Sequence, residues 1–362
     1  MSNQDQRLLS RAGFSRRSAL GGLGAGALFM SGPLGGPAWS QAAPAATGLI
    51  TKKLPKSDEM LPAIGLGTYL TFDVLPGRPR GHLGEVMKRF WEGGGRVVDT
   101  SPLYGMSEIS VGDFATAMGI NNELFITNKV WTTGEFLGDD SHARRSLEQS
   151  MQRLWRDRID VMQVHSLVNV DMMVPLLNAW KAEGRVRHVG VTHHELPYFA
   201  ALAQWVERGP VDFVQVHYSI HTRQAEERIL KAAADRGIAV LVNMPFEKAR
   251  LFKIVEGHTM PDFARDFAEN WAQFFLKWVI SHPTVICAIP ATTNPDHMSE
   301  NIGALKGPLP DPDMRVRMVR HMETIPGFEA LGQMPSYPGK TFVGAVQPPR
   351  RPAQPPAGPS RT

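Results

Sequence analysis

Cysteine is nearly absent from this sequence, which has one, Cys287, among 362 residues. A single cysteine excludes a disulfide within the chain and a zinc site built from several cysteines. Long hydrophobic runs are also scarce, because the apolar stretch near the N-terminus is interrupted by glycines and by Pro33. That stretch is too short and too weakly apolar to predict a stable membrane span.

Positive charge is scarce in the body of the chain, although the formal net charge is +4. Residues 1–42 carry +3 and residues 340–362 carry +4, which leaves −3 for the segment between them. A surface that binds nucleic acid needs clustered cations to neutralise phosphates, so the net-negative body argues against that class of protein. The apolar fraction of 43% is ordinary for a soluble globular protein.

The N-terminal segment has the layout of an export signal. Arg16 and Arg17 precede the glycine-rich apolar stretch, and the small residues of "WSQAAPAA" follow it. The segment resembles a twin-arginine (Tat) type signal peptide, although Ala19 stands where a large apolar residue is usual. We expect residues 1–42 to be recognised by the Tat export machinery and cleaved, with the mature protein in the periplasm. A basic leader without structure is the alternative.

From residue 63 onward, short apolar segments alternate with amphipathic ones. The amphipathic segments have apolar residues every three or four positions, as in a helix, for example in residues 142–155 and 226–237. The apolar segments predict eight buried strands, at residues 63–68, 96–100, 124–130, 159–165, 186–192, 211–218, 238–244 and 285–291.

Eight successive strand–helix units predict an α/β protein with a (β/α)₈ TIM barrel as its single domain, over residues 43–334. A short hairpin is expected before the first strand, and one further helix over residues 312–325. A doubly wound open sheet is the alternative, but no G-x-G-x-x-G sequence follows the first strand. Residues 335–362 are rich in proline and are predicted to be a disordered tail.

Four polar residues stand at or just after neighbouring strand ends: Asp99, Tyr104, Lys129 and His165. In this type of barrel, active sites form at the carboxyl ends of the strands. Each residue also has a structural alternative. Asp99 could cap a helix, and Tyr104 could be a packing residue. Lys129 could extend its amine to solvent, and His165 could be a hydrogen-bonded core histidine. Together they predict a buried lysine–aspartate pair beside a tyrosine, whose pKa the lysine would lower to suit a general acid.

At these residues the sequence resembles the aldo-keto reductase superfamily. The similarity spans roughly residues 60–305 and lies in "GLGT", "VVDTSPLYGMSE", "FITNKVW", "IDVMQVHSL", "GRVRHVGVT", "DFVQVHYS" and "AIPATTNPDHMSENIGAL". The resemblance implies reduction of aldehydes or ketones by hydride transfer from a nicotinamide nucleotide. It implies that Tyr104 is the general acid, tuned by Lys129 and Asp99, and that His165 orients the carbonyl group.

The resemblance also implies a cofactor site with departures from the family pattern. His193 and Asn243 replace an amide side chain and a stacking ring, and Ala291 and His297 replace the cations that pair with the 2′-phosphate of NADP. A neutral histidine lacks the charge and geometry of arginine, so NADP(H) is favoured but NAD(H) is possible. The implied cofactor-binding residues are Thr68, Asp99, Thr192, His193, Gln215, Asn243, Met244, Phe246, Thr292, His297, Glu300 and Asn301.

By the same resemblance, Phe72, Trp131 and His165 line the substrate side of the site. The histidines show no i, i+4 spacing on a helix, so no metal site is expected. The expected partner is a small-molecule carbonyl compound, whose identity the sequence leaves open, as it does the oligomeric state. A cofactor-sensing or partner-binding barrel with incidental catalysis is the alternative function, favoured by the departures at the cofactor site.

Overall fold

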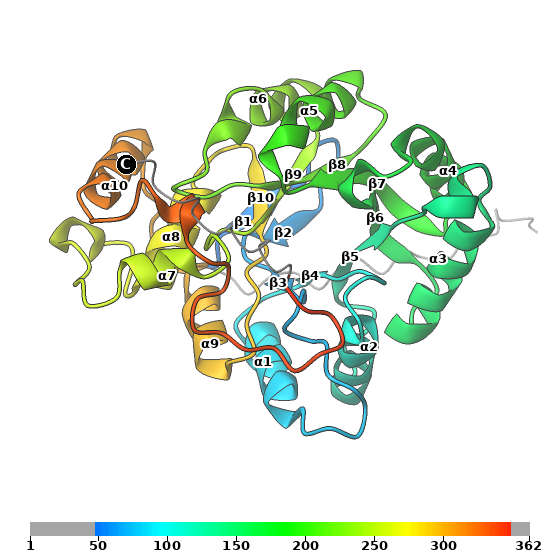
Figure 1. Ribbon diagram of the computed structural model, residues 1–362, viewed down its shortest axis with the longest axis horizontal. Coiled ribbons are helices and arrows are strands. Elements are labelled where there is room, and N and C mark those ends of the chain that lie inside the picture. The colour runs from blue at the N-terminus through cyan, green and yellow to red at the C-terminus, as the bar shows by residue number, and fades with distance from the viewer. Residues whose placement is uncertain (1–47, 349–362) are drawn as a thin grey trace, which may run out of the picture. The chain divides into compact units, whose positions relative to one another are not determined.

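The computed structural model describes residues 48–348, and the predicted signal peptide lies outside this range. Its centre is a parallel sheet in which each strand pairs with the next in the sequence. Isolated parallel bridges join Ile64 to Ala288 and Gly67 to Ala291, so the first and last strands also meet and close a barrel (Figure 1). The strands are β3 (Leu66–Gly67), β4 (Val97–Asp99), β5 (Phe125–Val130), β6 (Ile159–Val164), β7 (Val186–His193), β8 (Phe213–His217), β9 (Ala239–Asn243) and β10 (Val285–Ala288).

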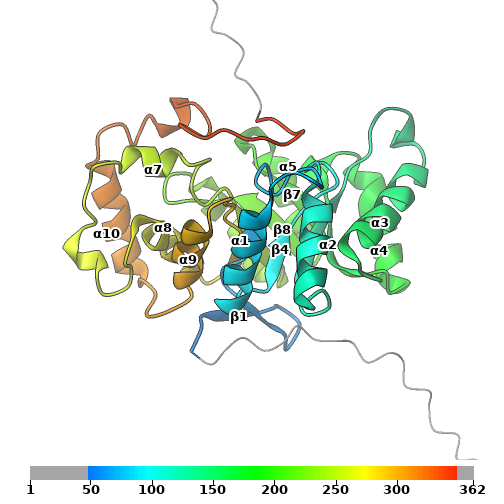
Figure 2. The same cartoon turned by 90° about the horizontal axis from the view of Figure 1, so that it is seen from below.

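All eight predicted strands are confirmed, and helices connect them around the outside of the barrel (Figures 1 and 2). Parallel neighbours require such crossover connections. Within the described range, no helix has the length and apolarity needed to cross a membrane. The helices are α1 (Gly81–Glu92), α2 (Ser107–Met118), α3 (Ser141–Leu154), α4 (Val170–Ala182), α5 (Phe199–Arg208), α6 (Ile229–Arg236), α7 (Arg250–Ile254), α8 (Trp271–Ile280), α9 (Pro295–Gly303) and α10 (Pro312–Glu323).

Successive strand residues alternate between the inside of the barrel and the layer under the helices. In β4, Val97 belongs to the apolar cluster inside the barrel, whereas Val98 belongs to the larger cluster that includes the helices. The predicted hairpin is β1 (Thr51–Lys53) and β2 (Met60–Pro62), which pair antiparallel. Leu61 of this hairpin joins the inner cluster. The hairpin therefore seals one end of the barrel interior and leaves the strands' carboxyl ends for polar residues.

The C-terminal segment 335–348 crosses the opposite end of the barrel from the hairpin (Figure 2, red). The Tyr337 amide donates to the Lys248 carbonyl oxygen over 2.8 Å, and the Val346 amide donates to Asp73 Oδ2 over 2.7 Å. The prediction of a disordered tail therefore does not hold for residues 335–348. Composition alone could not reveal this, since the segment's amides are satisfied by acceptors on the barrel. Residues 349–362 lie outside the described range.

Asp73 connects this segment to the loop that carries Tyr104. Its carboxylate is 1% exposed and also accepts a hydrogen bond from the Met106 amide over 2.8 Å. A Cβ on Gly344 would stand 2.3 Å from Asp73 Oδ2, so this close backbone approach depends on glycine. One buried carboxylate therefore holds two segments that are far apart in the sequence.

Replacing Asp73 with alanine is expected to loosen the C-terminal segment, because two partly buried amides lose a carboxylate acceptor. Hydrogen bonds to charged groups contribute about 1.5–3 kcal/mol each, so amide hydrogen exchange in residues 336–348 should accelerate by roughly tenfold or more. Hydrogen-exchange mass spectrometry measures this, with Asp58→Ala as a control that removes a solvent-exposed carboxylate from the hairpin. Equal exchange in the Asp73→Ala variant and the wild type would show that Asp73 does not anchor the segment.

Candidate active site

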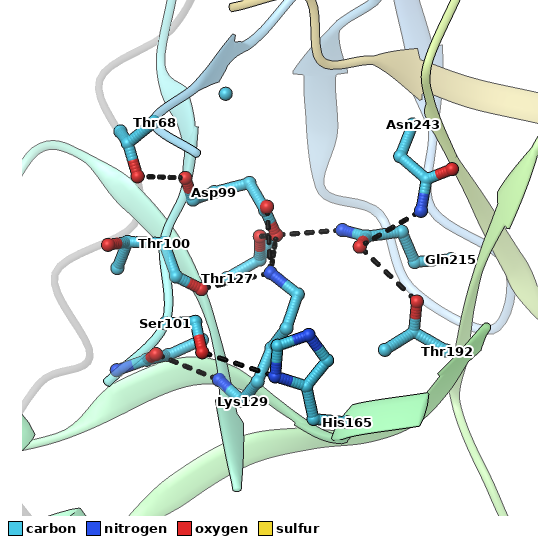
Figure 3. Close-up of polar contacts among 12 residues, drawn as sticks. Thr68, Asp99, Thr100, Ser101, Thr127, Lys129, His165, Thr192, Gln215 and Asn243 are labelled. Carbon is cyan, nitrogen blue, oxygen red and sulfur yellow. Dashed lines mark hydrogen bonds and ion pairs between the residues drawn. The ribbon is translucent and has the colours of Figure 1, made fainter. Parts of the chain in front are cut away.

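Asp99 and Lys129 form a buried ion pair at the carboxyl ends of β4 and β5. Lys129 Nζ donates to both carboxylate oxygens of Asp99 over 2.7 Å and to the Thr100 carbonyl oxygen over 2.9 Å (Figure 3). Asp99 Oδ1 also accepts from Thr127 Oγ1 and from Gln215 Nε2, each over 2.7 Å. Buried charges are tolerated when they are paired and hydrogen-bonded in this way. The predicted lysine–aspartate pair is therefore present and well satisfied.

Tyr104 and His165 lie beside this pair. Lys129 Nζ stands 4.9 Å from the centre of the Tyr104 ring, and the Tyr104 and His165 rings meet edge to face with centres 5.8 Å apart. Tyr69 contacts Tyr104 from another direction, with ring centres 5.0 Å apart. The structure thus brings together all four residues that were predicted to be catalytic.

The expected lowering of the Tyr104 pKa is not found. Burial and the nearby Asp99 carboxylate raise the pKa of Tyr104 well above its usual value, and the phenols of Tyr69 and Tyr337 add to this rise. The lysine does not reverse the rise because its charge is compensated by Asp99 at 2.7 Å. Tyr104 is therefore a protonated phenol throughout the neutral range, and it holds a proton that it can give.

His165 is a neutral imidazole in this environment. Burial, followed by the positive charge of Lys129, lowers the pKa of His165 to about 3. A neutral imidazole has one N–H donor and one acceptor nitrogen, so it can orient a substrate oxygen without adding a charge.

A reaction in which Tyr104 gives its proton to a substrate that His165 orients is expected to have a rate that is flat between about pH 5 and pH 9. A histidine with an ordinary pKa would give an inflection near pH 6.5, but the low pKa of His165 moves that titration below this range. The raised pKa of Tyr104 moves loss of the phenol proton above it. The measurement is kcat/KM against pH in buffers of constant ionic strength, and an inflection near pH 6.5 that disappears in His165→Asn would contradict it.

A polar row continues from Asp99 across the inside of the barrel. Gln215 Oε1 accepts from Thr192 Oγ1 over 3.3 Å and from Asn243 Nδ2 over 3.4 Å (Figure 3). The amide oxygen of Asn243 is buried, and it has no hydrogen-bond partner among residues 48–348. His193 directly follows Thr192 on β7, so its side chain lies on the opposite face of the strand and not in this row, and its Nδ1 accepts from the Glu195 amide over 3.1 Å. The row itself offers Asn243 Oδ1 as an acceptor of the kind that a carboxamide NH₂ group requires.

Thr68 and Met244, two more of the predicted cofactor residues, lie at the ends of this row, whereas Phe246 does not. The Thr68 hydroxyl donates to the Asp99 carbonyl oxygen over 2.9 Å, and Met244 directly follows β9 with φ 53°. Phe246 instead packs its ring against Phe252, with centres 4.7 Å apart, and belongs to the hydrophobic core. Its ring is not brought to the catalytic cluster, so it does not replace the stacking ring that is absent at Asn243.

The remaining predicted cofactor residues lie on α9 or just before it. Asn294 caps this helix by accepting from the Asp296 amide over 2.8 Å, as the sequence "TNPDH" indicates. Arg89 of α1 pairs with the Asp296 side chain over 2.6 Å, a contact that the sequence did not reveal. The predicted residues, some buried and some exposed, are Thr292 before the helix and His297, Glu300 and Asn301 within it.

The predicted substrate residues separate into two groups. Phe72 is fully buried against Phe114, with ring centres 6.3 Å apart, so it does not line an open cavity as predicted. Trp131 lines a cavity of about 300 Å³ together with Ser101 and Leu103 of the Tyr104 loop. A second cavity, of about 650 Å³, begins beside His165, and its wall includes Ser166, Leu167, His193, His194, Tyr198 and Trp205.

Sequence reasoning missed several neighbours of the catalytic residues. Thr127 stands two positions before Lys129 on β5, so strand periodicity alone places both side chains on one face. Ser101 lies within the motif that carries Asp99 and Tyr104, and its contact with His165 is described below. Tyr337 lies in the segment that was predicted to be disordered, so no pattern in the sequence pointed to it.

Comparison with known proteins decides the family. The family model described as "Aldo/keto reductase family" matches residues 63–317, which is more than half of the chain. The chain belongs to the aldo/keto reductase family. The barrel, with Asp99, Tyr104, Lys129 and His165 at one end, is therefore the aldo/keto reductase domain.

Individual relatives are distant. An NADH-specific methylglyoxal reductase of Escherichia coli is 26% identical over 202 residues, which cover 47% of this chain and 61% of that protein. An uncharacterised oxidoreductase of Schizosaccharomyces pombe is 29% identical over 173 residues, covering 46% and 54%. The chain thus spans little more than half the length of these relatives. The fold is similar to that of an aldo/keto reductase from Klebsiella pneumoniae in complex with NADP and acetate, with a TM-score of 0.63, 24% identity and coverage of 75% and 94%.

Proposed function

We propose that this aldo/keto reductase domain reduces aldehydes or ketones to alcohols with a nicotinamide nucleotide. The observation that carries the proposal is the buried cluster in which Tyr104, a protonated phenol, lies beside the Lys129–Asp99 pair and the neutral His165. The four groups come from neighbouring strand ends or the loop after β4, as expected for an active site in this type of barrel.

The four residues of the cluster have different roles in proton transfer. Tyr104 donates its phenol proton to the carbonyl oxygen, and His165 orients that oxygen through its N–H. Lys129 Nζ, 4.9 Å from the phenol ring and held by Asp99, stabilises the phenolate that remains. A reduced nicotinamide, when bound, supplies the hydride that adds to the carbonyl carbon. The products are an alcohol and the oxidised nucleotide.

The polar row inside the barrel fits the carboxamide group of a nicotinamide. Asn243 Oδ1, which has no hydrogen-bond partner among residues 48–348, is an acceptor for the carboxamide NH₂. NADP(H) is favoured because it is the family's usual cofactor and is bound in the Klebsiella structure. NAD(H) is supported by the NADH-specific relative and by Ala291 and His297 in place of cations.

Nucleotide binding and turnover by the purified protein test this function. We expect NADPH or NADH to bind and to be oxidised when aldehydes, including methylglyoxal, are added. Binding without turnover of any aldehyde or ketone would favour the alternative, a cofactor-sensing or partner-binding barrel with incidental catalysis. Failure to bind either nucleotide would exclude both carbonyl reduction and cofactor sensing.

We also propose that residues 1–42 direct export to the periplasm through the Tat machinery. The support is the paired Arg16 and Arg17 before a glycine-rich apolar stretch. Since folded proteins pass through this route, the cofactor would travel with the barrel and be renewed there by coupled oxidation and reduction of two substrates. Replacing both arginines with lysine should leave the protein in the cytoplasm. Exported protein without nucleotide, by absorbance and mass spectrometry, would refute a retained cofactor.

A further inference from the structure

Ser101 contacts the catalytic histidine from the loop that follows β4. It is fully buried, and its Oγ lies 3.3 Å from His165 Nδ1 (Figure 3). The same oxygen accepts a hydrogen bond from the Leu103 amide over 3.2 Å. Ser101 thus has one donor and one ring nitrogen within hydrogen-bonding distance.

The direction of the serine–histidine hydrogen bond follows from counting donors and acceptors. The Ser101 hydroxyl has one hydrogen and two lone pairs, and the Leu103 amide occupies one lone pair. If His165 carried its proton on Nδ1, that proton would point at Ser101 Oγ, and the buried hydroxyl hydrogen would have no acceptor. Leaving a buried polar hydrogen unpaired costs about 1–3 kcal/mol. The arrangement that satisfies every group has the hydroxyl donating to Nδ1.

We propose that Ser101 is a positioning residue that fixes the tautomer of His165. Its hydroxyl donates to Nδ1, so the single proton of the neutral ring stays on Nε2 and is available to a carbonyl oxygen. This inference deepens the proposed function and rests on it for its catalytic meaning. The tautomer itself is a property of the protein and can be measured without turnover.

The local chain geometry supports this role. Pro102 follows Ser101 and restricts its backbone to extended conformations, which limits the positions that the hydroxyl can take. The Tyr104 amide donates to the Ser101 carbonyl oxygen over 3.0 Å, so the serine also shapes the turn that carries the tyrosine. The stretch from Asp99 to Tyr104 therefore positions the lysine, the histidine and the phenol together.

Nitrogen-15 NMR of the histidine-labelled full chain tests the tautomer directly. The wild type is expected to show His165 with a protonated Nε2 and an unprotonated Nδ1 at neutral pH. In Ser101→Ala, a substantial population should carry the proton on Nδ1, and Ser101→Thr, which keeps the hydroxyl, should retain the wild-type state. A wild type protonated on Nδ1, or a Ser101→Ala variant with unchanged nitrogen shifts, would overturn the proposal.

Kinetics separate positioning from a merely structural role. Ser101→Ala is expected to lower kcat by about tenfold while KM changes less than about twofold, with recovery in Ser101→Thr. Ser110→Ala is the matched control. Ser110 is also a buried serine, but its hydroxyl has no hydrogen-bond partner among residues 48–348. Equal losses in both variants would overturn the proposal. The wild type could reduce no carbonyl compound while His165 has the expected tautomer and Ser101→Ala changes it. In that case the proposed function fails and the Ser101–His165 assignment stands.

Discussion

Tyr104→Phe is expected to lower kcat/KM for aldehyde reduction by about a thousandfold while nucleotide binding stays unchanged. The variant keeps the ring that packs against Tyr69 and His165 and removes only the hydroxyl. General acids contribute roughly a hundredfold to ten-thousandfold, and Tyr104 holds a transferable proton throughout the neutral range. The measurement is steady-state kinetics with NADPH and NADH, together with nucleotide titration.

The matched control is Tyr218→Phe. Tyr218 is fully buried, and its hydroxyl contacts Glu226 and Arg315 away from the Tyr104 cluster. This variant should keep its turnover, although it is expected to lose some stability. If Tyr104→Phe retains wild-type activity, the enzymatic assignment fails. If it loses nucleotide binding as well, the hydroxyl acts in binding rather than in proton transfer.

Lys129→Met and Asp99→Leu are each expected to lower the free energy of unfolding by about 3–5 kcal/mol. Each substitution leaves the other charge buried and unpaired, in a site where the side chains of Lys129 and Asp99 are 1% and 5% exposed. The double variant should cost clearly less than the sum of the two single variants, because it removes both charges. Urea unfolding of the four proteins at one pH measures the coupling.

An exposed ion pair serves as the control for this cycle. Lys53 and Asp58 are 2.7 Å apart, with side chains 61% and 100% exposed, so Lys53→Met should leave the unfolding midpoint unchanged. Strict additivity of the Lys129 and Asp99 substitutions would mean that the buried pair is not coupled. Lys129→Met should also lose turnover, since the phenolate of Tyr104 would lack the Lys129 ammonium.

Much of the fold could be predicted because its signals are local. The eight strands are near-continuous apolar runs, and the helices between them repeat apolar residues every three or four positions. The clustering of the proposed catalytic residues could be predicted for the same reason: Asp99, Lys129 and His165 stand at strand ends, and a parallel barrel brings those ends together. Thr127 could also have been predicted, because it stands two positions before Lys129 on the same strand.

Other features depend on contacts between distant parts of the chain. Residues 335–348 have a composition typical of disorder, but Asp73 and Lys248 accept hydrogen bonds from their backbone amides. Phe72 and Phe246 are aromatic residues near the strand ends, and only the packing of neighbouring elements shows that both are buried in the core. Whether an aromatic ring lines a cavity is decided by its neighbours in space, which no sequence spacing specifies.

The sequence by itself determined the barrel, the residues proposed to be catalytic and their approximate places, because apolar periodicity and residue type act over short distances along the chain. The tertiary structure alone decided the protonation states. Burial lowers the pKa of His165, and Asp99 together with burial keeps the Tyr104 phenol protonated despite the nearby lysine. A pKa depends on the solvent and charges that surround a group in space, and those surroundings exist only once the strands have closed around it.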